Sequence, residues 1–214
     1  MTKAKWIWLG AVALLYGAFW IWYGGNGDPL SQEEGEAMLA DIEQVHGLKL
    51  EDTPEGSMSR NLLAMLPNDD GKEFYAVNLE TRNKGAAAKE AEARYGAIVV
   101  PLLLERGGHP VFVSERAGLM LGKFGEQVDR VGVVRYRSLR DLLDMIADER
   151  MLEGSAYKNA SLAHTEVFIT RPTITFLQVR FIIGLLLTLV AIGGLAVIGR
   201  VQNRRSRGAN AASA

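Results

Sequence analysis

The sequence contains no cysteine, which excludes disulfide bonds and metal sites built on thiolates. Histidine is also scarce: the chain has only His46, His109 and His164, and no two of them have the spacing of a metal-binding pair such as His-Glu-x-x-His. A nucleophile elbow, a phosphate-binding loop and a dinucleotide-binding fingerprint are absent as well. We therefore expect the protein to bind no metal and no cofactor.

Aspartate and glutamate are absent outside residues 24–178. These residues hold all 25 acidic side chains and 17 of the 24 lysines and arginines, a net charge of −8, whereas the rest of the chain carries +7. Proteins that bind nucleic acids present a basic surface to the phosphates, so the acidic central segment argues against a nucleic-acid partner. The basic residues near the C-terminus are better suited to the anionic headgroups of membrane lipids.

Two long segments lack any charged side chain. They are residues 6–23 (WIWLGAVALLYGAFWIWY) and residues 181–199 (FIIGLLLTLVAIGGLAVIG). As a helix, either segment would be about 27–29 Å long, close to the ~30 Å hydrocarbon core of a bilayer. All four tryptophans lie at the two ends of the first segment, where a membrane interface favours them. We therefore predict two transmembrane helices, with two buried core helices of a globular protein as the alternative.

The flanks of these segments predict how they are processed and oriented. The bulky residues 20–23 stand where small residues should precede cleavage, so we predict an uncleaved anchor, with a processed leader as the alternative. Six lysines and arginines flank the outer ends of the helices, against Arg171 and Arg180 on the inner side. This asymmetry predicts cytoplasmic termini (residues 1–5 and a basic, disordered tail at 200–214) and an extracytoplasmic central domain. The protein would then be an integral protein of a bacterial inner or plasma membrane, in contact with lipid.

Residues 24–71 are expected to be a helical lead-in and linker. Ser31 and Glu34 form a capping box, which predicts the start of a helix, and Gly47 predicts its end. A short helix is expected at 58–66, after a polar loop at 48–57.

Residues 72–172 show the hydrophobic patterns of a domain with the element order β-α-β-β-α-β. The strands are expected at 73–79, 109–115, 128–137 and 164–170, and the helices at 85–106 and from 139 onward. This is the order of a ferredoxin-like α+β domain, in which both helices cover one face of an antiparallel sheet. The other face carries valine and phenylalanine, and pairing two such sheets in a C2 dimer would cover it. A linker at 173–180 is expected to follow.

The junction between the third strand and the second helix of this domain is particularly clear. Alternation places Val131, Val133, Arg135 and Arg137 on one face, and Gly132, Val134 and Tyr136 on the other. Ser138 is the expected N-cap of the helix, with Asp141 in its first turn.

Five short stretches carry a resemblance to a known family. They are AVNLETR, ARYGAIVVPLL, GGHPVFV, VDRVGVVRYRS and SAYKNASLAHT. From about Tyr75 to Thr165 the chain resembles the domain of unknown function 1330 family, within the dimeric α/β-barrel superfamily. The resemblance implies a ferredoxin-like fold and a homodimer, but little about activity, since the family has no agreed one. It covers less than half of the chain and leaves out the lead-in and both apolar segments.

A ligand pocket, if the domain has one, is expected in a cleft between the sheet and a dimer partner. The candidate residues are Tyr75, Asn78, His109, Arg135 and Tyr136. An arginine there could hold a carboxylate through two hydrogen bonds, and a tyrosine or histidine could transfer a proton. Alternatively, Arg135 and Arg137 pair with acidic residues across the dimer.

Two functions follow from these observations. In the first, the helices anchor a non-enzymatic domain that dimerises or binds another envelope protein, which the missing catalytic constellation favours. In the second, the protein is a membrane-tethered enzyme or small-ligand binder, similar to monooxygenases and isomerases of the same superfamily. A closed pocket onto which Arg135 and a histidine converge would favour the second function. An open sheet face of valines and phenylalanines would favour the first.

Overall fold

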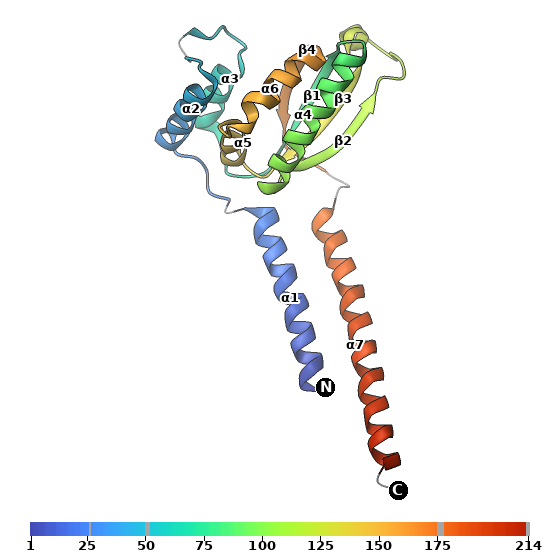
Figure 1. Ribbon diagram of the computed structural model, residues 1–214. Helices are drawn as coiled ribbons and strands as arrows, with labels where there is room; N and C mark the ends of the chain where they lie inside the picture. The colour runs from blue at the N-terminus through green and yellow to red at the C-terminus, as the bar shows by residue number, and fades with distance from the viewer. Residues whose placement is uncertain (26, 50–51, 175–177, 213–214) are drawn as a thin grey trace. The chain divides into compact units, whose positions relative to one another are not determined.

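The computed structural model describes the chain apart from residues 26, 50–51, 175–177 and 213–214. It divides the described residues into two compact units (Figure 1). The first unit consists of residues 1–22 together with 174–214, and the second consists of residues 23–173. The expected linker at 173–180 therefore lies partly outside the described residues.

The first unit contains two helices, α1 (Lys3–Gly24) and α7 (Val179–Ala212), both long and apolar enough to cross a membrane. They run antiparallel and contact each other, because the Trp8 indole donates a hydrogen bond to the carbonyl of Ala191 (3.1 Å). The same indole lies against Gly194 so closely that no side chain could be accommodated there. The expectation of a disordered tail at 200–214 is wrong for residues 200–212, because α7 continues through them.

The second unit is built on a four-stranded antiparallel sheet with the strand order β2-β3-β1-β4. The strands are β1 (Phe74–Arg82), β2 (His109–Glu115), β3 (Arg130–Tyr136) and β4 (Leu162–Thr170). All four were expected from the sequence, within a few residues at their ends. The chain is thus an α+β protein in which the described residues form this sheet and seven helices.

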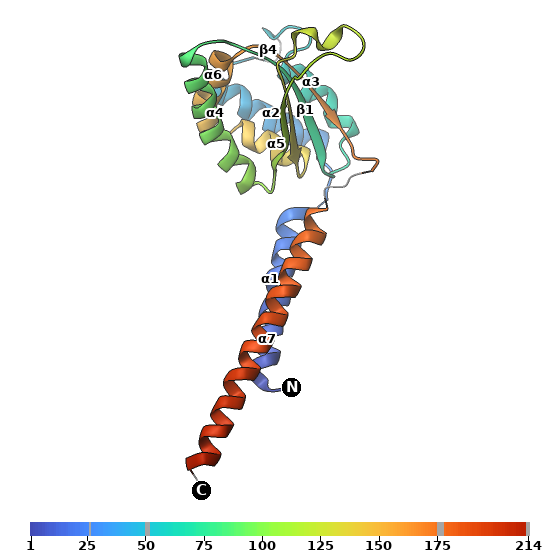
Figure 2. The same ribbon diagram turned by 90° about the vertical axis from the view of Figure 1, so that its right-hand side faces the viewer.

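Three helices cover one face of the sheet (Figure 2). They are α4 (Ala86–Glu105), α5 (Leu139–Ile146) and α6 (Arg150–Ser161). Val134 and Tyr136 of β3 point toward them and pack in a core with Leu102 of α4, Met145 of α5 and Met151 of α6. The sequence patterns predicted α4 and α5, whereas α6 was not expected.

The caps predicted for two helices are confirmed. The Ser31 hydroxyl accepts a hydrogen bond from the Glu34 amide, the Glu34 carboxylate accepts one from the Ser31 amide, and α2 (Gln32–His46) follows. Gly47 ends α2 in the left-handed conformation, with φ of 63°. At the start of α5, the Ser138 hydroxyl accepts a hydrogen bond from the Asp141 amide (3.1 Å).

The lead-in shares its hydrophobic core with the sheet domain. Ile42 of α2 and Leu62 of α3 (Met58–Met65) are buried with Phe74 of β1 and with Leu139 and Leu143 of α5. Residues 24–71 are therefore an integral part of the second unit, although the sequence suggested a segment ahead of the domain.

Candidate functional site

The face of the sheet opposite α4, α5 and α6 carries a row of apolar side chains. Phe112 lies opposite Val133, Val133 lies opposite Val77, and Val77 lies opposite Phe168, so each strand contributes one residue. Directly opposed residues of antiparallel strands point to the same face. Phe112 is 54% exposed and Phe168 is 47% exposed. We call the surface formed by these four residues the open face.

A buried arginine lies at one end of the same face. Arg135 of β3 is 0% exposed. Its Nε and Nη2 donate to the Glu73 carboxylate at 2.8 and 2.5 Å, and Nη2 also donates to the Tyr23 carbonyl at 3.0 Å. Its Nη1 donates to the carbonyl of Gly107 at 2.7 Å. The guanidinium carbon lies 3.8 Å from the centre of the Tyr23 ring, within the range of a cation–π contact.

This arrangement gives Arg135 a structural role. Each of its three nitrogens donates to a protein oxygen, and the Tyr23 ring covers the guanidinium. The arginines do not need acidic partners from another protomer, because Arg135 pairs with Glu73 and Arg137 pairs with Asp141 of the same chain. The sequence analysis did not identify Glu73 or Tyr23 as partners.

Two other candidates lie beside Arg135. Tyr75 and His109 are its direct cross-strand neighbours on β1 and β2. Burial raises the pKa of Tyr75, and the nearby charge of Glu73 raises it further. His109 Nδ1 contacts the carbonyl of Pro110 at 3.0 Å, and its Nε2 contacts the Tyr23 hydroxyl at 3.1 Å. Because a carbonyl can only accept, Nδ1 is the donor to Pro110, and in the neutral imidazole Nε2 accepts from the tyrosine.

The remaining two candidates point toward the other face of the sheet. Tyr136 stacks on Phe74 with ring centres 5.4 Å apart, and burial raises the pKa of Tyr136 well above its ordinary value. The Asn78 amide nitrogen donates to the carbonyl of Gly132 at 3.2 Å. The five candidates therefore do not converge on one pocket: Tyr75, His109 and Arg135 lie together, whereas Asn78 and Tyr136 lie on the helix-covered side.

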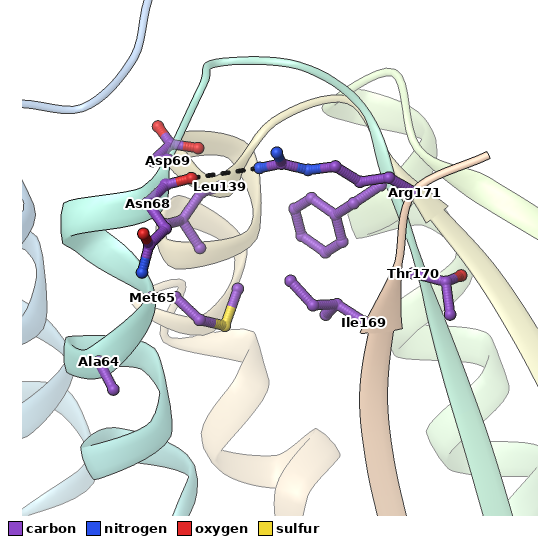
Figure 3. Close-up of a pocket in the computed structure, with 9 residues that line it drawn as sticks. Ala64, Met65, Asn68, Asp69, Leu139, Ile169, Thr170 and Arg171 are labelled. Atoms are coloured by element: carbon purple, nitrogen blue, oxygen red, sulfur yellow. Dashed lines mark hydrogen bonds between the residues drawn. The ribbon is translucent and has the colours of Figure 1, made fainter. Parts of the chain in front are cut away.

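A cavity of about 320 Å³ lies elsewhere in the second unit (Figure 3). Its apolar wall includes Met65, Phe74, Leu139 and Ile169, and Arg171 closes one side by donating to the carbonyl of Asn68 at 3.3 Å. None of the five candidate residues lines it. Within the described residues, no three histidine, aspartate or glutamate side chains are placed to share a metal ion.

A network of ion pairs lies where the helix-covered face of the sheet meets α4. Glu80 of β1, only 7% exposed, accepts from Arg130 Nε at 2.5 Å. Arg130 also pairs with Glu92 of α4. Tyr95 of α4 and Lys158 of α6 lie near Glu80, and burial raises the pKa of Tyr95 and lowers that of Lys158. Arg130 pairs with both Glu80 and Glu92, so these ion pairs join the sheet to α4.

Replacing Tyr95 with phenylalanine should reduce the loss of stability at alkaline pH. Burial raises the pKa of Tyr95 from 10 to about 12, so the folded chain keeps a proton that the unfolded chain loses above pH 10. The stability linked to this proton is fully present below pH 10 and is lost as the pH rises to about 12. In urea titrations across this range, the unfolding free energy of Tyr95→Phe should fall less steeply than that of the wild type. Equal slopes would contradict the burial of the phenol.

No model of a known protein family matches the chain, and no curated protein matches it. Two similar solved structures are both of the protein RPA0582. The methylated form is 20% identical with a TM-score of 0.49, and the match covers 58% of this chain and 96% of that one. The other, described as a protein of unknown function from Rhodopseudomonas palustris, is 22% identical with a TM-score of 0.49, covering 57% and 97%. These structural neighbours therefore assign no activity to the chain.

Proposed function

We propose that the protein is held in a membrane by α1 and α7 and that its sheet domain is a dimerisation module with a ferredoxin-like fold. The element order β1-α4-β2-β3-α5-α6-β4 and the strand order β2-β3-β1-β4 support this fold. The motif resemblance between Tyr75 and Thr165 supports a place in the domain of unknown function 1330 family. In the proposed topology, residues 1–5 and the C-terminal residues are cytoplasmic, and residues 24–172 lie outside the cytoplasm.

The open face carries the dimer proposal. Contiguous exposed apolar surface on a folded domain marks an interaction site. A sheet can cover such a face by packing on a second sheet about 10 Å away, and a twofold axis makes one apolar row complementary to its own copy. The second copy is therefore the partner that we propose, with another envelope protein as the competing partner.

The enzyme or ligand-binding alternative gains no support from the residues suggested for it. The guanidinium nitrogens of Arg135 donate hydrogen bonds to Glu73, Gly107 and Tyr23. The side chain is therefore not placed to bind the carboxylate of a ligand through two hydrogen bonds. Tyr136 lies on the other face of the sheet, against Phe74.

A charge placed on the open face should dissociate the dimer. We expect the detergent-solubilised full chain to sediment as a dimer and Phe112→Asp to sediment as a monomer. Because the twofold axis repeats the substitution, the dissociation constant should rise about 100-fold or more. Phe112 is 54% exposed in the single chain, so the substitution should leave the fold intact.

Leu152→Asp provides the matched control, because Leu152 is 46% exposed on α6, away from the open face. It should remain dimeric. A monomeric wild type, or a Phe112→Asp variant that dimerises as tightly as the wild type, would contradict the proposal. A monomeric chain that is recovered from the membrane with a different protein would point to the envelope-partner reading.

A further inference from the structure

We infer that the loop between β2 and β3, residues 116–129, contacts the second copy in the dimer. We call this loop the arm. This inference rests on the dimer proposed above and assigns it a second contact surface. The tip of the arm, residues 119–124, has the sequence LMLGKF. The open face would form the centre of the interface, and the arm would reach from it onto the partner.

Three of the four apolar side chains of the tip are almost completely exposed. Met120 is 99% exposed, Leu121 is 91% exposed and Phe124 is 103% exposed, while Leu119 is 42% exposed. Single exposed apolar residues are ordinary on a protein surface, whereas a cluster of large ones marks a contact surface. Among the described residues of this chain, none covers the side chains of Met120, Leu121 and Phe124.

The base of the arm is fixed by hydrogen bonds. The Arg116 amide donates to the carbonyl of Asp129 at 2.8 Å, and its Nε donates to the carbonyl of Val128 at 2.7 Å. The Thr81 hydroxyl of β1 donates to the carbonyl of Gln127 at 2.5 Å. A short 3-10 helix, η3 (Phe124–Gln127), begins at the last residue of the tip. The apolar side chains are thus held out on an ordered base, which lowers the entropic cost of binding.

The arm lies at the end of the sheet remote from the points where the chain enters and leaves the domain. Tyr23 contacts Arg135, and Thr170 pairs with Tyr75, so entry and exit lie at one end of the strands. The arm begins after Glu115, which pairs with Arg130 at the other end. The central segment is acidic, with a net charge of −8 over residues 24–178, which disfavours contact with anionic lipid. A protein surface is therefore the better partner.

The direction of the arm favours a second copy as that partner. In Figure 2 the yellow-green arm projects from the end of the sheet toward the side opposite α4, which is the side of the open face. A sheet of four strands, with seven residues in β2 and β3 and nine in β1 and β4, presents roughly 500 Å² on one face. A stable interface needs about 800 Å² from each partner. The open face alone is therefore too small for a stable interface, and the arm adds apolar surface on the same side of the sheet.

Two measurements on the full chain in detergent test the inference. Benzoylphenylalanine in place of Leu121 should photo-crosslink to a second copy, giving a product of twice the chain mass, whereas the same group in place of Leu152 should not. The triple variant Met120→Ser, Leu121→Ser, Phe124→Ser should raise the dimer dissociation constant about tenfold or more. All three side chains are exposed, so the fold should be unaffected.

The outcomes separate the arm from the dimer itself. If the wild type is monomeric, the dimer proposal fails and the arm fails with it. If the wild type is dimeric, the arm alone is overturned when the probe at 121 labels lipid, another protein or nothing. An unchanged dissociation constant of the triple variant would overturn it equally, while the dimer through the open face would stand.

Discussion

Replacing Arg135 with alanine should lower the free energy of unfolding by about 3–5 kcal/mol, a large part of the stability of an ordinary domain. The substitution removes the ion-pair partner of Glu73 and the hydrogen bonds that Arg135 donates to the carbonyls of Gly107 and Tyr23. A buried polar group without a partner costs about 1–3 kcal/mol. It also removes the guanidinium that packs on the Tyr23 ring. Because the Glu73 side chain is 33% exposed, water can partly solvate the orphaned carboxylate. We therefore expect a loss near the lower end of the range.

Urea titration of the detergent-solubilised full chain, followed by near-ultraviolet circular dichroism, measures this effect, because the micelle protects the apolar helices. Arg94→Ala is the matched control: the Arg94 side chain is 56% exposed and pairs with Glu90, which is 64% exposed. Such surface pairs contribute about 0–1 kcal/mol. If Arg135→Ala costs no more than Arg94→Ala, the structural role is wrong. An open arginine in a ligand site would then be the better account.

Local sequence patterns predicted most of the second unit. The alternation in β3 placed Val133 and Arg135 on one face and Val134 and Tyr136 on the other, as the register shows. Ser31, Gly47 and Ser138 were correctly predicted as caps. These signals are readable because strand alternation and helix capping depend on residues only a few positions apart.

The surroundings of Arg135 could not be predicted in the same way. Its partners Glu73 and Tyr23 are 62 and 112 positions away along the chain, so only the folded structure brings them together. In contrast, strand alternation alone could have predicted that the candidate residues lie on opposite faces of the sheet. Tyr75 and Asn78 are three positions apart on one strand, an odd number, and must therefore point to opposite faces.

Helix α6 and the end of α7 show two further limits of pattern reading. The stretch that forms α6 contains Gly154 and Ser155, which interrupt an apolar stripe and weaken the helical signal. Its helix is stabilised by packing, since Met151 is buried in the core beside α4. The residues from 200 to 212 are mostly polar or basic, yet they continue the helix begun by the apolar segment. Adding a residue to an existing helix is far easier than starting one.

Replacing Ile42 with alanine should lower the free energy of unfolding of the whole second unit by about 2–5 kcal/mol. Ile42 of α2 is 1% exposed and lies in one core with Phe74 of β1 and Leu143 of α5. Truncating it removes buried methyl and methylene groups and leaves a cavity that the surrounding side chains fill only in part. The free energy of unfolding of the sheet domain should fall as well, because residues 24–71 supply one wall of its core.

The form of the transition matters as much as its midpoint. If the lead-in and the sheet domain unfold together, Ile42→Ala should shift a single urea transition without splitting it. Leu48→Ala, just beyond α2, is the matched control, because Leu48 is 44% exposed and its truncation should cost about 0.5 kcal/mol or less. An early separate transition that alone responds to Ile42→Ala, with the main one unchanged, would show that residues 24–71 fold independently. A single shifted transition would instead mean that the sheet domain, which carries the open face, requires residues 24–71 to fold. Because Leu30 is buried in the same core, any shortened form of the protein should then begin before Leu30.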